Sequence, residues 1–154
     1  MRITINGTLP RGVFTFDKPT LRRAAAFFAA KSRRRVGNPT WHEVVVHLVH
    51  DAESDAAHRA IMDTPGATDV ITQAYDAIPP ETPGLLGELV VNLDQAVRAA
   101  PTRAGWSPSR ELLLYVAHGM DHLSGADDHS ERDYRAMRRR ELGWMREFAA
   151  RDAD

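Results

Sequence analysis

Six consecutive apolar residues stand at positions 112–117, Leu112-Leu113-Leu114-Tyr115-Val116-Ala117. Ser107-Pro108 precede them and form a typical helix start, because serine caps free backbone amides and proline fits the first turn. Gly125 stands where such a helix would end. A helix that is apolar all round is buried within a protein. The sequence therefore predicts a buried helix from about Ser107 to Gly125, at the centre of the fold.

Segments typical of strands and helices alternate along the rest of the chain. Apolar, β-branched or alternating stretches predict four strands, at residues 2–6, 44–49, 68–72 and 85–91. Capping residues and helical spacing predict further helices at residues 18–35, 51–62, 92–100 and from 130 onward. In the last helix, four residues at helical spacing are expected to face the core: Tyr134, Met137, Met145 and Phe148. The arginines at 138–140 are expected to face water. The expected fold class is α+β, a small mixed β-sheet flanked by helices.

The length and composition predict one domain over residues 1–154. The 154 residues, 43% of them apolar, suffice for one hydrophobic core and are too few for two well-built domains. The absence of cysteine excludes disulfides, thiolate metal sites and cysteine nucleophiles. No apolar run approaches the ~20 residues of a membrane span, and no signal-peptide stretch follows Met1. We therefore expect a soluble cytoplasmic protein with no membrane partner.

The charge is unevenly distributed along the chain. Residues 1–50 hold nine Lys and Arg against two acids, whereas residues 51–154 hold 11 against 19. Arginine outnumbers lysine by 18 to 2 and suits bidentate contacts with phosphate. This asymmetry favours an anionic partner. A GC-rich genome is an alternative origin of the arginine excess.

Three of the seven histidines fall within a dozen residues, His118, His122 and His129. On a helix the first two share one face, and imidazoles at this spacing can hold one divalent ion. Gly125 allows the chain to turn back and supply a third ligand. Three protein ligands leave a position for water, which a zinc ion acidifies enough to act as hydroxide near neutral pH. The sequence thus predicts a metal site on the buried helix, with the metal-bound water, and no identified side chain, as the catalytic group.

Together these residues resemble the YbeY family of bacterial rRNA maturation factors, which are metal-dependent endoribonucleases. His118-Gly119, His122-Leu123, Gly125 and the following Asp-His match the family motif H-G-x-x-H-L-x-G-x-D-H. Thr68-Asp69-Val70-Ile71 is similar to the family's T-D-V-L, and residues 84–91 are similar to its stretch that leads into a G-D-I strand. The resemblance runs from about His58 to the last helix. It implies one divalent metal ion, with zinc favoured, and RNA as substrate, in small-subunit ribosomal RNA processing and ribosome quality control.

Several positions depart from the family motif. One extra residue separates Gly125 from His129, so the third ligand aligns with either His129 or Asp128. We favour His129, because imidazole completes a three-histidine site, while an aspartate ligand is also chemically sound. Asp127 and Asp128 are expected either to orient a ligand histidine or to serve as ordinary turn residues. Asp121 replaces the usual leucine before the second histidine. The arginine that the family carries ahead of Thr-Asp falls at about Met62.

A basic cluster follows the first predicted helix and is the candidate RNA-binding patch. Its members are Lys31, Arg33, Arg34 and Arg35, with Arg22 and Arg23 as further candidates. The alternative interpretation is a solvated helix end, where cations are favoured in any case. The remaining histidines show no ligand spacing and are interpreted as structural: His42, His47, His50 and His58.

Three functions are consistent with these patterns. The leading hypothesis is a zinc-dependent endoribonuclease for single-strand-type RNA in rRNA processing and ribosome maturation. The second is a ribosome-assembly or RNA-binding factor that keeps the metal but is catalytically weak. The third is a zinc hydrolase of another class. It is disfavoured as a metalloprotease, because the usual glutamate base after the first histidine is Gly119 here.

Overall fold

Four strands and five helices make up the computed structural model, which describes residues 1–77, 83–102 and 104–153. The elements follow one another as β1 (Arg2–Asn6), α1 (Lys18–Arg35), β2 (Trp41–Val49), α2 (Asp51–Met62), β3 (Val70–Asp76), β4 (Leu85–Asn92), α3 (Leu93–Ala99), α4 (Pro108–Leu123) and α5 (Glu131–Asp152). The predicted buried helix is α4. The predicted caps Asp17 and Ser107 each accept a hydrogen bond from a backbone amide in the first turn of their helices.

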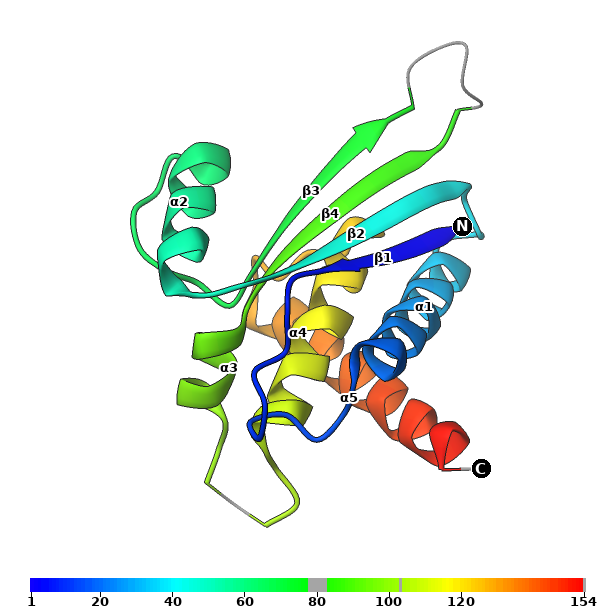
Figure 1. The fold of residues 1–154 in the computed structure, drawn as a ribbon. Helices are drawn as coiled ribbons and strands as arrows, with labels where there is room; N and C mark the ends of the chain where they lie inside the picture. Colours follow the sequence, from blue (N-terminus) through cyan, green and yellow to red (C-terminus); the bar gives the residue numbers. More distant parts are fainter. Residues whose placement is uncertain (78–82, 103, 154) are drawn as a thin grey trace.

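The strands form one mixed sheet in the order β1-β2-β4-β3. The strands β1, β2 and β4 are parallel, and β3 runs antiparallel to β4 at the edge. Helix α1 makes the crossover between β1 and β2, as a parallel pair requires. The α+β class with a small mixed sheet and flanking helices is therefore confirmed (Figure 1).

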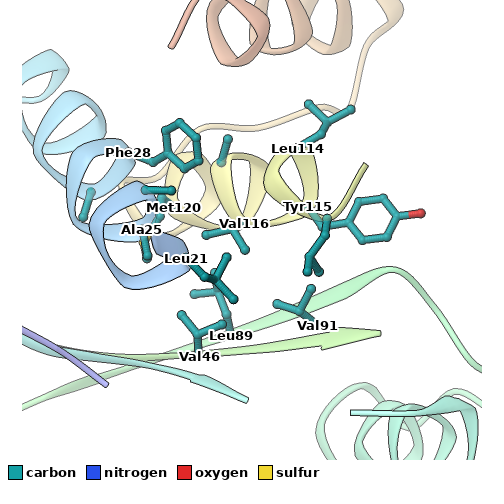
Figure 2. Packing of buried hydrophobic residues seen from close by; sticks show 14 of the residues in the cluster. Leu21, Ala25, Phe28, Val46, Leu89, Val91, Leu114, Tyr115, Val116 and Met120 are labelled. Carbon is teal, nitrogen blue, oxygen red and sulfur yellow. The ribbon is translucent and has the colours of Figure 1, made fainter. Parts of the chain in front are cut away.

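The core lies between one face of the sheet and the helices α1 and α4 (Figure 2). Along β2 the side chains alternate, so Val44 and Val46 are fully buried while Val45 is only half-buried. The fully buried Leu89 of β4 lies beside Val46 beneath α1 and α4. Helix α4 is covered by the sheet on one side and by α5 on another, which explains why the sequence at 112–117 is apolar all round (Figure 1).

Two local predictions were wrong. The third strand begins at Val70 because the hydroxyl of Ser54 bonds both the backbone amide and the carbonyl of Thr68, which removes Thr68 from strand pairing. In α5, Tyr134 is 44% exposed, whereas Glu141 is fully buried. Met137, Met145 and Phe148 are buried as expected, so the predicted inner face of α5 is confirmed at three of its four residues. None of the helices in the described ranges has the length and apolarity that crossing a bilayer demands.

Candidate metal centre

Helix α4 presents His118 and His122 on one face, in its last turns before Gly125. The Nε2 atoms of the two rings lie 3.0 Å apart, and the rings are nearly perpendicular to each other. Both side chains are more than two-thirds buried. The spacing of four residues therefore brings together the two imidazole nitrogens that the sequence analysis paired.

The other nitrogen of each ring has a fixed partner. Nδ1 of His122 lies 3.0 Å from the carbonyl oxygen of Ala126, and Nδ1 of His118 lies 2.9 and 3.1 Å from the carboxylate oxygens of Glu141. A carbonyl oxygen only accepts, so Nδ1 of His122 carries the hydrogen and its Nε2 carries the lone pair in the neutral ring. A carboxylate holds His118 in the same tautomer. Two lone pairs that face each other at 3.0 Å repel unless a proton or a metal ion lies between them, so this donor set fits a metal ion.

Asp128 supplies the third atom of the cluster. Its Oδ2 lies 3.9 Å from Nε2 of His118 and 3.8 Å from Nε2 of His122. These three ligand atoms all lie within 4.8 Å of one another. Gly125 adopts a φ of +94°, a conformation that favours glycine, and so allows the chain to turn back after α4.

His129 lies outside this group of three atoms. Its backbone amide donates to Oδ1 of Asp127, and its ring, 89% exposed, has Nε2 3.4 Å from the Asp127 carboxylate. The turn made by Asp127 therefore directs the His129 ring to solvent just before α5 begins. Asp127 was expected either to orient a ligand histidine or to serve as a turn residue, and its carboxylate accepts a hydrogen bond from the backbone amide of His129 in this turn. The geometry favours Asp128 over His129 as third ligand.

Glu141 of α5 is a site residue that the sequence analysis missed. Burial raises the pKa of Glu141, and the hydrogen bond from His118 opposes this rise without cancelling it. Burial lowers the pKa of His118, but the hydrogen bond and charge of Glu141 raise it by more, so it lies above the ordinary value. The sequence did indicate that residue 141 is buried, because it stands four residues from both Met137 and Met145 on the buried face of α5.

The cluster opens into a cavity of about 540 Å³. Helix α2 contributes His58 and Met62 to its wall, residues 68–72 form a second side, and α5 adds Tyr134 and Arg138. His58 was interpreted as structural from the sequence. Its Nδ1 indeed bonds the carbonyl of Gly66 at 2.8 Å, yet its side chain also lines the cavity.

Asp121 forms a buried ion pair in the middle of the helical layer. Its Oδ2 accepts hydrogen bonds from Nε and a terminal nitrogen of Arg140, at 3.1 and 2.8 Å. Its Oδ1 lies 3.6 Å from Nε of Arg35. Asp121 is fully buried, so these two arginines from α1 and α5 balance a charge that the family motif does not carry. Arg140 therefore does not face water, contrary to expectation.

The predicted RNA-binding patch is largely engaged within the chain. Lys31 pairs with Glu147, Arg33 donates to the carbonyl of Pro39, and Arg35 contacts Asp121 and Ser124. None of the four patch residues, Lys31, Arg33, Arg34 and Arg35, is among the described residues that line the cavity. The patch stays a prediction.

The chain is similar to known endoribonucleases over most of its length. Residues 15–149 match the family model described as "Endoribonuclease YbeY". Relatives of the same name include a Rhodopirellula baltica protein, 38% identical over 67% of this chain and 52% of its own length. A Paenarthrobacter aurescens protein is 31% identical over 72% of this chain and 74% of its own length, and an Anaeromyxobacter protein is 33% identical over 92% and 69%. The chain thus spans about half the length of the Rhodopirellula relative.

Proposed function

Since the chain belongs to the YbeY endoribonuclease family, we propose that it is a metal-dependent endoribonuclease of single-strand-type RNA. The proposed role is ribosomal RNA processing, in ribosome maturation and quality control on the small subunit, in the cytoplasm and through one domain. Family membership supports the RNA substrate, and the resemblance described above supports the ribosomal role. The observation that carries the proposal is the convergence of two imidazole nitrogens and one carboxylate oxygen on a cavity.

We propose His118, His122 and Asp128 as the ligands of one divalent ion, with zinc favoured by two nitrogens and one oxygen. When bound, such an ion supplies Lewis acidity for a phosphodiester and lowers the pKa of a bound water. The contribution of the protein's other residues is to position the histidine ligands. Glu141 and the carbonyl of Ala126 hold the hydrogen on Nδ1 of each histidine, so that both Nε2 lone pairs face the cavity side of α4.

The packing of Gly119 argues against a peptidase of the type with glutamate after the first histidine. A Cβ at this position would lie 2.5 Å from Cδ2 and 2.8 Å from Cγ of Leu89. Leu89 is fully buried in β4, so the helix meets the sheet at this glycine. A glutamate side chain here would have to enter the core and could not reach a ligand or substrate.

The test combines metal content with RNA cleavage. We expect the purified chain to hold about one divalent ion and to cleave single-stranded RNA, and His122→Ala to lose both properties. The matched pair Asp128→Ala and His129→Ala separates the two candidate ligands, since the first should lose the metal and the second should keep it. RNA cleavage by His122→Ala at the wild-type rate would refute the proposed function. Metal loss in His129→Ala alone would restore His129 as the third ligand.

One observation favours a second candidate, an RNA-binding assembly factor that retains the metal but turns over slowly. Met62 stands at the position of the family arginine and lines the cavity with an apolar, 56% exposed side chain. This candidate predicts metal and RNA binding with negligible cleavage. Metal-dependent turnover of the wild type, lost in His122→Ala, would exclude it.

A further inference from the structure

Arg138 is the one lysine or arginine among the described residues that line the cavity beside the metal ligands. The other charged residues of the wall are Asp69 and Asp128. Apart from the histidines, the remaining wall residues are uncharged: Met62, Thr68, Val70, Ile71, Thr72 and Tyr134. A substrate phosphate that enters this cavity would therefore meet a single guanidinium.

The guanidinium of Arg138 is held in place by Tyr134, one turn earlier in α5. Its central carbon lies 5.3 Å from the centre of the tyrosine ring, and a terminal nitrogen donates to the tyrosine hydroxyl at 3.2 Å. A cation over an aromatic face is attracted by the ring, so the side chain is ordered without an acid partner. The position of the charge is therefore set before any ligand arrives.

Arg138 also has unused hydrogen-bonding capacity. Its Nε is buried and has no hydrogen-bond partner, and no carboxylate lies within ion-pair distance of Arg138 in the described part of the chain. Two other arginines of α5 are paired, Arg135 with Glu131 and Arg140 with Asp121. A half-buried guanidinium without an acid partner carries an uncompensated charge, which favours the binding of an anion beside it. Its planar donors match the oxygens of a phosphodiester.

We propose that Arg138 binds the RNA phosphate next to His118, His122 and Asp128. This inference rests on the proposed function, because it takes RNA as the substrate. It assigns the phosphate contact to α5, on the cavity wall formed with Tyr134, and leaves the α2 wall at Met62 without a cation. Arg138 is thus a substrate-binding residue for the reaction and no part of the metal coordination.

The first experiment measures RNA binding with the metal chelated, so that cleavage cannot consume the probe. A short labelled single-stranded oligoribonucleotide is titrated with wild type and Arg138→Gln over a range of salt concentrations. We expect affinity to fall about ten- to a hundredfold, as for loss of a charged hydrogen bond. The slope of log affinity against log salt should fall by about 0.7, the value for one phosphate contact on a single strand. A merely structural role would leave this slope unchanged.

Two further variants complete the design. Arg139→Gln removes the neighbouring charge, which is exposed and does not line the cavity, and should leave the affinity close to wild type. Arg138→Lys keeps the charge but loses the planar donors, and should retain the salt slope while recovering only part of the affinity. Equal losses in Arg138→Gln and Arg139→Gln, or no loss in Arg138→Gln, would overturn the proposal. Circular dichroism of each variant confirms that it is folded.

Cleavage by the metal-loaded protein then separates this inference from the proposed function. If the wild type binds RNA through Arg138 but does not cut it, the endoribonuclease proposal fails and the phosphate contact stands. If the wild type cuts RNA and Arg138→Gln cuts and binds it equally well, only the phosphate contact fails. Absence of RNA binding by the wild type would refute both.

Discussion

Gly119→Ala tests how closely α4 approaches the sheet beneath the metal site. The added Cβ would lie 2.5 Å from Cδ2 of Leu89 and 3.3 Å from Cγ2 of Val70. Gly143→Ala in α5 is the matched control, because its Cβ would meet only the Arg146 guanidinium, at 3.8 Å. Both substitutions replace a glycine within a helix, so the gain in helix propensity is the same in each.

The expected magnitudes follow from these distances. Gly143→Ala should raise the free energy of unfolding by about 0.5–1 kcal/mol, the ordinary gain of alanine over glycine in a helix. Gly119→Ala makes the same gain but forces a methyl group into a packed core, which costs about 1–3 kcal/mol. The propensity gain cancels in the comparison, so Gly119→Ala should be less stable than Gly143→Ala by about 1–3 kcal/mol.

Urea unfolding of the metal-free protein, followed by circular dichroism, measures both values. Each kcal/mol corresponds to about 2–4 °C in Tm for a chain of this size, which provides an independent check. The Gly119 variant should also hold zinc more weakly, because α4 carries two of the ligands. If Gly119→Ala proves as stable as Gly143→Ala, the close contact of α4 with Leu89 is refuted.

Three further perturbations test the site and its surroundings. Glu141→Gln should weaken zinc binding about 10–100-fold, measured by competition with a chromophoric chelator, and an unchanged affinity would mean that the buried carboxylate does not support the ligand. Arg140→Ala should lower the free energy of unfolding by about 3 kcal/mol, since it leaves buried Asp121 with a single cation; a loss near zero in urea unfolding would contradict this. The hydrogen bond from Arg98 lowers the pKa of Asp51 to about 2, from 3.8. A carboxyl group with a lowered pKa stabilises the fold at pH values above its pKa in the unfolded chain, and this stabilisation is lost as the pH falls through its pKa in the folded chain. The difference in the free energy of unfolding between wild type and Asp51→Asn should therefore close between about pH 5 and pH 2. A difference that stays constant over this range would contradict the expectation.

The sequence was informative about the fold where the signals are local. The apolar run at 112–117 predicted the central helix, and Ser107 and Gly125 bounded it to within about two residues. The third strand was misplaced because Thr68 is held by Ser54, a contact between separate segments that no local pattern reveals. On α5, Met137, Met145 and Phe148 were placed correctly on the inner face, whereas Tyr134 is exposed and Glu141 was missed. The spacing from Met137 and Met145 indicated burial at 141, but no local pattern reveals that His118, 23 residues away, is the partner of this acid.

The same limit applies to the site. The spacing of four residues was sufficient to pair His118 with His122, because both lie on one helix. The third ligand depends on a short turn in which the Asp127 carboxylate accepts from the His129 amide. Adding or removing one residue in this turn would change which side chain, Asp128 or His129, faces the cavity. The contribution of Arg138 depends on how α5 docks against α4, and a run of three arginines carries no local sign of which one turns inward.

The ion triad of Asp121 with Arg35 and Arg140 restricts how this chain can be recombined with its relatives. A chimera whose α4 carries the family's usual leucine in place of Asp121 would leave the guanidinium groups of Arg35 and Arg140 facing apolar side chains, without this carboxylate. Transplanting α5 alone would remove Arg140 from the buried Asp121. Exchange of any one helix should therefore yield poorly soluble or metal-free hybrids, whereas exchange of the three interacting positions as a unit should be tolerated.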